Sequence, residues 1–170
     1  MNWIFCLLLA FAQFFPHNKH QEHTRQKNTS SKCSFADTSD LFFSETPSDR
    51  QLLVFTSFSV PIATWKETSY YLERIKGAFV IRGLPNNSFQ DLQKKILELR
   101  KEGILAEILL DPAAFEEYSV VSTPTFLLRQ DKLYDKVSGN VTVPYVLSLF
   151  SQSGDTSALA TEFLNKVREN

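Results

Sequence analysis

The alternation of apolar and polar residues separates an irregular first part of the chain from a regular second part. In the regular part, residues 52–58 form a continuous apolar and β-branched run, which is typical of a strand buried on both faces. Residues 78–81 and 105–110 predict two further strands. The last two predicted strands, 125–128 and 133–137, are joined by a turn that is short enough for an antiparallel hairpin.

Between the predicted strands, apolar residues recur at the spacing of amphipathic helices. Pro61 opens the first helix, which extends to about Lys76, because a proline in the first turn removes an N–H that has no partner there anyway. Ser88 is the expected cap of the second helix. The apolar residues of that helix are expected to share one face: Phe89, Leu92, Ile96 and Leu99.

The remaining helices complete a β-α-β-α-β-α-β-β-α-α order. A short helix runs from Asp111-Pro112 to Tyr118, and helices over 143–150 and 156–168 follow the hairpin. Strands that alternate with helices imply a mostly parallel sheet, to which the hairpin adds an antiparallel edge. We therefore expect an α/β, thioredoxin-like three-layer fold, in which the unit 78–101 is additional to the minimal arrangement.

The amino-terminal part has a different character. An apolar run over 3–9 precedes Ala10-Phe11-Ala12, a small-x-small cleavage pattern, so residues 1–12 are expected to be a signal peptide. The run is too short to span a bilayer, although an uncleaved anchor is the alternative because no Lys or Arg precedes it. Residues 13–50 are polar and predict a flexible tether, which leaves 51–170 as the folded domain.

Composition narrows the range of functions. Hydrophobic residues make up 43% of the chain and charged residues 22%, as in ordinary globular proteins. The formal net charge is -1 and the folded part has no basic block, so nucleic acid is not an expected partner.

The place where a thioredoxin carries its thiols reads Phe58-Ser-Val-Pro-Ile62. Ser59 and Ile62 occupy the two cysteine positions, and neither residue can exchange a disulfide. No His or Cys occurs from 51 to 170, so Ser-His-Asp and Cys-His sites cannot be built in this domain. We expect no catalytic residue, no cofactor and no metal.

Chemically distinctive residues do occur in the predicted tether. Cys33 is the only cysteine expected in the mature chain, and it is interpreted as an exposed, unused thiol in preference to an intermolecular disulfide. His17, His20 and His23 are spaced by three, but no acidic or thiol partner completes a metal site.

Open α/β sheets usually present their sites at the carboxyl ends of the parallel strands, where we expect Ser57, Ser59, Arg82, Asp111 and the Thr123-Pro124 loop. Arg82 and Asp111 allow two hypotheses, an ion pair that ties two loops together or direct contact with a partner. The peptide bond between Thr123 and Pro124 is expected to be cis. Two roles are open for this loop: it sets the local path of the backbone, or it contacts an extended peptide. The candidate partner-binding residues are Phe58, Ser59, Pro61, Arg82, Asp111, Thr123 and Pro124.

A series of short motifs carries a more specific resemblance. The motifs are Ser57-Phe-Ser-Val-Pro61, Val80-Ile-Arg-Gly-Leu84 with Asn87-Ser-Phe89, Asp111-Pro112 with Phe115, Thr123-Pro-Thr-Phe126 and Asp135-Lys-Val-Ser-Gly-Asn140. Over about 52–150 they resemble the TrbC family of pilus-assembly proteins from F-type conjugative transfer systems. The resemblance implies a periplasmic type IV secretion component without known catalysis, which works with other assembly proteins such as TraW.

Three functional hypotheses follow from these residues and motifs. The first is a periplasmic scaffold or chaperone for conjugative pilus assembly, which the export signal and the motifs favour. The second is a thiol-disulfide enzyme, against which Ser59 and Ile62 count directly. The third is a thioredoxin-fold, peptide-binding chaperone unrelated to conjugation.

Overall fold

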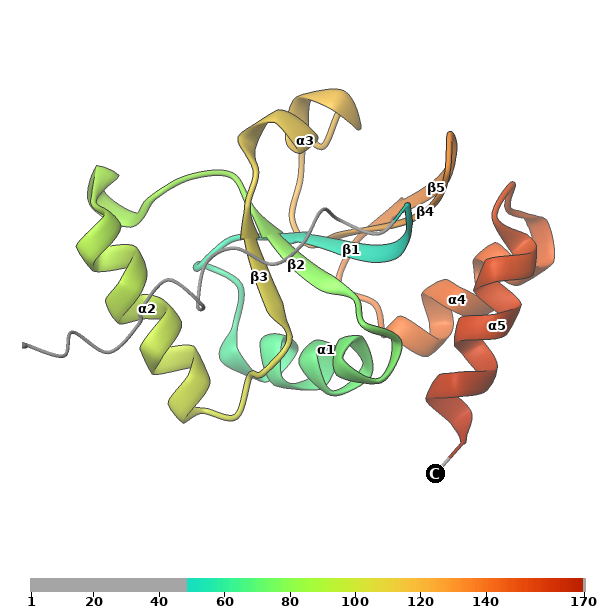
Figure 1. Cartoon of the computed structure of the whole chain (residues 1–170), viewed down its shortest axis with the longest axis horizontal. Coiled ribbons are helices and arrows are strands. Elements are labelled where there is room, and N and C mark those ends of the chain that lie inside the picture. The colour runs from blue at the N-terminus through green and yellow to red at the C-terminus, as the bar shows by residue number, and fades with distance from the viewer. Residues whose placement is uncertain (1–48, 170) are drawn as a thin grey trace, which may run out of the picture. The chain divides into compact units, whose positions relative to one another are not determined.

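A computed structural model describes residues 49–169, and its centre is a five-stranded sheet of order β3-β2-β1-β4-β5 (Figure 1). The strands are β1 (Arg50–Thr56), β2 (Ala78–Ile81), β3 (Glu107–Leu110), β4 (Thr125–Gln130) and β5 (Leu133–Ser138). β1, β2 and β3 pair in parallel, whereas β4 is antiparallel to both β1 and β5. The predicted α/β architecture, mostly parallel with an antiparallel hairpin at one edge, is therefore confirmed.

The helices of the described part are α1 (Ile62–Ile75), α2 (Phe89–Lys101), α3 (Pro112–Glu117), α4 (Val143–Ser153) and α5 (Ser157–Arg168), with a 3₁₀ turn, η2 (Pro85–Asn87), before α2. Ser88 caps α2 as predicted, because its Oγ accepts the N–H of Asp91 at 3.2 Å. The carboxylate of Asp111 caps α3 in the same way, at 3.0 Å from the N–H of Ala114. The element order is the one predicted, while its thioredoxin-like identity stays a prediction.

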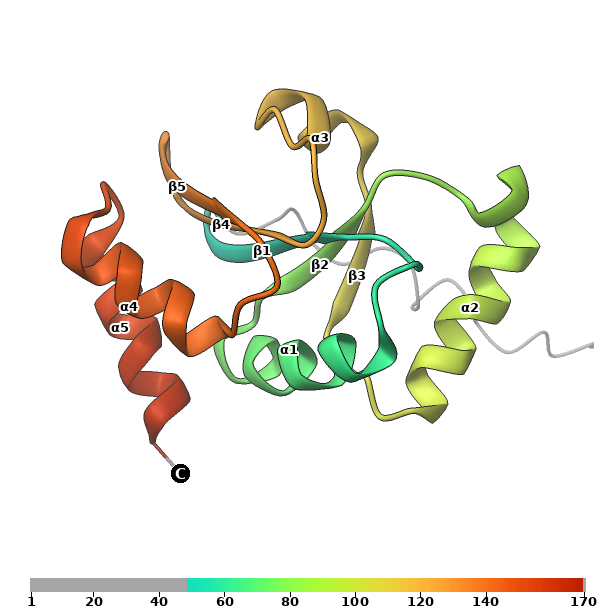
Figure 2. The same cartoon turned by 180° about the vertical axis from the view of Figure 1, so that it is seen from behind.

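The two faces of the sheet bury separate apolar clusters. Successive side chains of a strand point to opposite faces, so Leu52 and Val54 enter one cluster and Leu53 and Phe55 enter the other. The first cluster includes buried residues of α1, α2, α4 and α5, and we call this side the four-helix face. The second includes Ala114 and Phe115 of α3, and we call it the α3 face. Figures 1 and 2 show α3 across the sheet from α1.

Three local predictions were wrong. β1 ends at Thr56, because Ser57 begins a turn in which its carbonyl accepts the N–H of Val60 at 3.0 Å. β3 begins at Glu107 and not at Leu105, because the N–H groups of Leu105 and Ala106 both donate to Ser69 Oγ at 3.1 Å. The third wrong prediction placed Phe89 on the buried apolar face of α2.

Phe89 does not join that face. It is 70% exposed, whereas Leu92 and Leu99 are 2% and 6% exposed. Phe89 is the first residue of α2, so its side chain lies beyond the part of the helix that packs on the core.

Residues 1–48, which include the predicted signal peptide, most of the tether and the candidate residues Cys33, His17, His20 and His23, lie outside the described residues. Arg50, predicted as the last residue of the tether, is instead the first residue of β1. Within residues 49–169, no helix has the length and apolar character needed to cross a membrane.

Candidate functional site

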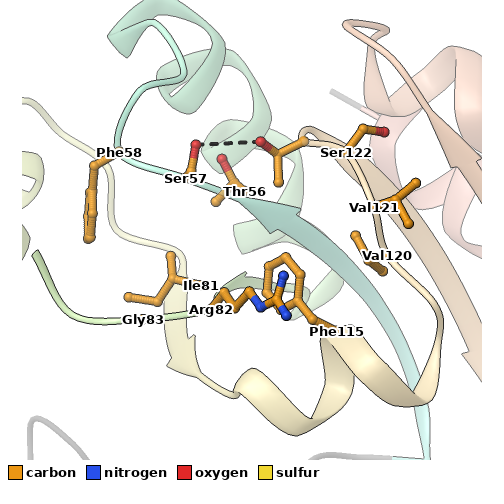
Figure 3. Close-up of a pocket in the computed structure, with 11 residues that line it drawn as sticks. Thr56, Ser57, Phe58, Ile81, Arg82, Gly83, Phe115, Val120, Val121 and Ser122 are labelled. Atoms are coloured by element: carbon orange, nitrogen blue, oxygen red, sulfur yellow. Dashed lines mark hydrogen bonds between the residues drawn. The ribbon is translucent and has the colours of Figure 1, made fainter.

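A pocket of about 250 Å³ lies where β1 and β2 end, between α3 and the loop that leads into β4 (Figure 3). We call it the strand-end pocket. It is lined by Thr56, Ser57, Phe58, Ile81, Arg82, Gly83, Phe115, Val120, Val121, Ser122 and Thr123.

The sheet register brings these segments together. Thr56 is paired with Ile81, so the residues that follow, Ser57 and Arg82, leave neighbouring strand ends. The antiparallel pairing of β1 with β4 places Thr123 beside Ser57, with 3.4 Å between their hydroxyl oxygens. Three segments far apart in sequence therefore meet at one end of the sheet.

Hydroxyl groups dominate the polar side of the pocket. Ser57 Oγ lies 2.7 Å from Ser59 Oγ, which continues the contact with Thr123 in a short chain of hydroxyls. The loop is held in turn by Thr125, whose hydroxyl donates to the carbonyl of Ser122 at 2.7 Å. The Thr123-Pro124 peptide bond is cis, as predicted.

Arg82 supplies the positive charge of the pocket. Its side chain is exposed, and none of the ion pairs or side-chain hydrogen bonds among residues 49–169 includes it. Asp111 does not pair with it, because the Asp111 carboxylate caps α3. The hypothesis of an ion pair between these loops is therefore wrong; the link that exists is a backbone one, from the N–H of Asp111 to the carbonyl of Ile81 at 3.1 Å.

The apolar side of the pocket comes from α3 and the segment after it. Phe115 is buried and packs edge-on against Phe55, with 4.9 Å between ring centroids and 88° between ring planes. Val120 is also buried, whereas Val121 is 96% exposed. The pocket therefore combines an exposed aliphatic side chain with a buried apolar wall.

Only some of the predicted site residues line the strand-end pocket. Phe58, Arg82 and Thr123 line the strand-end pocket, and Ser59 reaches it through its contact with Ser57. The other three do not line it: Pro61 is the exposed N-cap of α1, Asp111 caps α3, and Pro124 accepts the N–H of Gly139 through its carbonyl.

Sequence reasoning missed Val121 as a lining residue and placed Phe115 only within a motif. No local pattern marks Val121, because a valine before a Thr-Pro turn looks the same whether it is buried or exposed. Its exposure follows from the path of the loop, which the sequence pattern does not reveal.

The side chains of the pocket set what it can bind. The hydroxyl of Ser57 has two other hydroxyls as its side-chain partners, so no described group beside it is a ready proton acceptor. No group of three potential metal-ligating side chains occurs within residues 49–169. The pocket offers one guanidinium, several hydroxyls and an apolar wall, a set of groups that suits a peptide segment.

Comparison with known proteins gives one finding. A family model described as type-F conjugative transfer system pilin assembly protein matches residues 54–157, which is more than half of the chain. No curated protein matches the chain. The matched region contains all three segments that line the strand-end pocket.

Proposed function

The chain belongs to the family of type-F conjugative transfer system pilin assembly proteins, and from this premise we propose that it is a non-catalytic, periplasmic component that acts through protein–protein contacts. Its partners in this proposal are other assembly proteins of the transfer system, including TraW-like proteins. A peptide-binding chaperone unrelated to conjugation would use the same pocket, and family membership favours the first function.

The main support for this docking site is that Phe58, Arg82 and Thr123 line one pocket although they belong to three separate segments of the chain. Arg82 is the only ionisable residue that lines this pocket, so its charge is available to a carboxylate of the partner. The apolar wall of Phe115 and Val120 would receive a neighbouring side chain.

The loop before β4 supports an extended partner. The backbone N–H groups of Val121 and Thr123 donate to no backbone carbonyl among the described residues. An extended peptide could pair with them, since main-chain hydrogen bonds give affinity in this mode and side-chain pockets give specificity. Arg82 would then select segments with an acidic residue.

The test is affinity capture of the protein from its own cell envelope, with identification of the chains that co-purify. The Arg82→Ala variant should no longer co-purify with the assembly proteins. Its melting temperature should stay close to that of the wild type, because an exposed side chain without an ion pair contributes about 0.5 kcal/mol or less to the free energy of unfolding. Arg168→Ala removes another exposed arginine, at the end of α5, and is the matched control. Equal capture by both variants would mean that the strand-end pocket is not the docking site.

Export has a separate test. The protein recovered from the periplasmic fraction should begin at Gln13, which N-terminal sequencing can establish. Cytoplasmic protein that retains Met1 would contradict the periplasmic part of the proposal.

The absence of redox activity is also testable. A single predicted tether thiol, Cys33, cannot cycle between dithiol and disulfide, so the purified protein should not reduce insulin. A turnover that is lost in Cys33→Ser would contradict the non-catalytic part.

A further inference from the structure

A second groove lies between the start of α1 and the carboxyl-terminal half of α2, and it shares only Phe58 with the strand-end pocket. We call it the α1–α2 groove. Its volume is about 480 Å³, which falls within the roughly 300–1,000 Å³ of ordinary ligand pockets. The groove is therefore large enough for one or two side chains of a bound segment.

The floor of the groove is apolar. Phe58 stacks on Trp65 with 6.0 Å between ring centroids and 7° between ring planes. Trp65 and Leu99 belong to the core, so they fix the floor. Ile62, at the first position of α1, is 43% exposed and adds an aliphatic edge that solvent can reach. An apolar side chain from a partner would cover this surface.

Two lysines and two glutamates lie on the rim of the groove, and one of these lysines has no ion-pair partner among residues 49–169. Glu98 is paired with Lys95 at 2.8 Å, and Glu102 with Lys66 at 2.7 Å. The hydrogen bond from Lys66 holds the pKa of Glu102 below its ordinary value, so this carboxylate stays ionised and engaged. Lys101 takes part in no ion pair or side-chain hydrogen bond within residues 49–169.

We propose that the α1–α2 groove binds a protein segment that presents a large apolar side chain next to a carboxylate. The apolar side chain lies against Ile62 and the Phe58–Trp65 stack, and the carboxylate faces Lys101. Charge complementarity selects this partner, because both acidic rim residues already have a lysine and the remaining cation does not. This site shares only Phe58 with the strand-end pocket, and Arg82 does not line it.

The binding test uses the full chain with Trp3→Phe, which leaves Trp65, in the floor of the groove, as the only tryptophan. The probe is the capped pentapeptide Gly-Leu-Phe-Asp-Gly, titrated while Trp65 emission is followed. Its twin with Lys in place of Asp should bind about threefold more weakly, the scale of an exposed charge pair. A twin with Ala in place of Phe should bind about tenfold more weakly, because it buries less apolar area.

A charge reversal on the protein identifies the groove. Lys101→Glu should invert the preference, so that the Lys peptide binds better than the Asp peptide. Lys94→Glu is the matched control on α2, since Lys94 is not among the residues that line the groove, and it should leave the preference unchanged.

Several outcomes would overturn the proposal. They are a titration that does not saturate, a preference that Lys101→Glu leaves unchanged, and an inversion that Lys94→Glu also produces. A Trp65 response to anionic lipid vesicles with none to the peptide would assign the groove to a membrane surface instead. Partner capture with Arg82→Ala is measured independently of the peptide titration. A failed titration therefore does not contradict docking at the strand-end pocket, and a failed capture does not contradict peptide binding in the α1–α2 groove.

Discussion

On the four-helix face of the sheet, parts of α1, α2, α4 and α5 bury one continuous core, whereas on the α3 face a single helix of 6 residues covers a smaller cluster. The strand-end pocket lies where the two clusters meet, since Phe115 and Val120 of the smaller cluster and Ile81 of the larger cluster all line it. We therefore expect a division of labour in stability, in which the four-helix face contributes more to the free energy of unfolding than the thinly covered α3 face.

Neighbouring residues of β5 hold helices on the two faces. The carboxylate of Asp135 accepts the N–H of Asp155 at 3.0 Å and the N–H and hydroxyl of Thr156 at 2.7 and 2.5 Å, which fixes the start of α5. The ammonium of Lys136 donates to the carbonyl of Tyr118 at 2.6 Å, at the end of α3. Each residue thus links the sheet to the helix layer on its own side.

The largest expected effect comes from adjacent leucines of β1 that point to opposite faces. Leu52 and Leu53 are 0% and 3% exposed, so substitution by alanine deletes equally buried atoms. Leu52→Ala should lower the free energy of unfolding by about 4–5 kcal/mol and Leu53→Ala by about 2–3 kcal/mol, because the cost depends on how far the surroundings can collapse. α3 is short and can settle into the cavity, whereas α4 and α5 pack on each other.

Urea denaturation of the two variants measures this difference directly. Equal losses would show that both faces are equally rigid and would remove the proposed division of labour. A larger loss for Leu53→Ala would reverse it.

The second prediction compares the two side chains of β5 that bind helix ends, Asp135 and Lys136. Asp135→Ala should cost about 1–3 kcal/mol, because it leaves two backbone N–H groups and a hydroxyl at the start of α5 without their acceptor. Lys136→Ala should cost about 0.5–1 kcal/mol, since an exposed cation at a helix end contributes little. Thermal melts rank the two, and Lys132→Ala, at the exposed hairpin tip, serves as the control.

The smallest effect is the pH dependence of the Lys66–Glu102 pair, which joins α1 to the end of α2 on the four-helix face. The hydrogen bond from Lys66 lowers the pKa of Glu102 from 4.5, so the pair stabilises the fold above that pH and this contribution is lost as the pH falls through the lowered pKa. Lys66→Ala should therefore be slightly less stable than the wild type at about pH 7, and the difference should shrink as the pH falls through the lowered pKa of Glu102. A difference that does not shrink would mean that Lys66 acts through packing.

Much of the fold could be predicted from the sequence, because its signals are local. The continuous apolar run of β1, the cap at Ser88 and the short turn of the hairpin depend on near neighbours, and all three appear in the structure. The late start of β3 could not be predicted, because it depends on the hydroxyl of Ser69, which is distant in sequence and takes the N–H groups of Leu105 and Ala106.

The candidate site, too, could be predicted from the sequence only in part. The carboxyl ends of parallel strands meet at one edge of a sheet, so the sequence alone predicted that Phe58 and Arg82 would lie together, and residue identity determined that no thiol or imidazole would lie beside them. Thr123 lies with them because β4, which it precedes, is antiparallel to β1. Only the tertiary structure decided which polar groups pair. Asp111 could have met Arg82 or the start of α3, and it caps the helix because the N–H of Ala114 lies within hydrogen-bonding distance in the fold. A choice between competing partners depends on distances of a few ångströms, and these are set by the packing of segments that are remote in sequence.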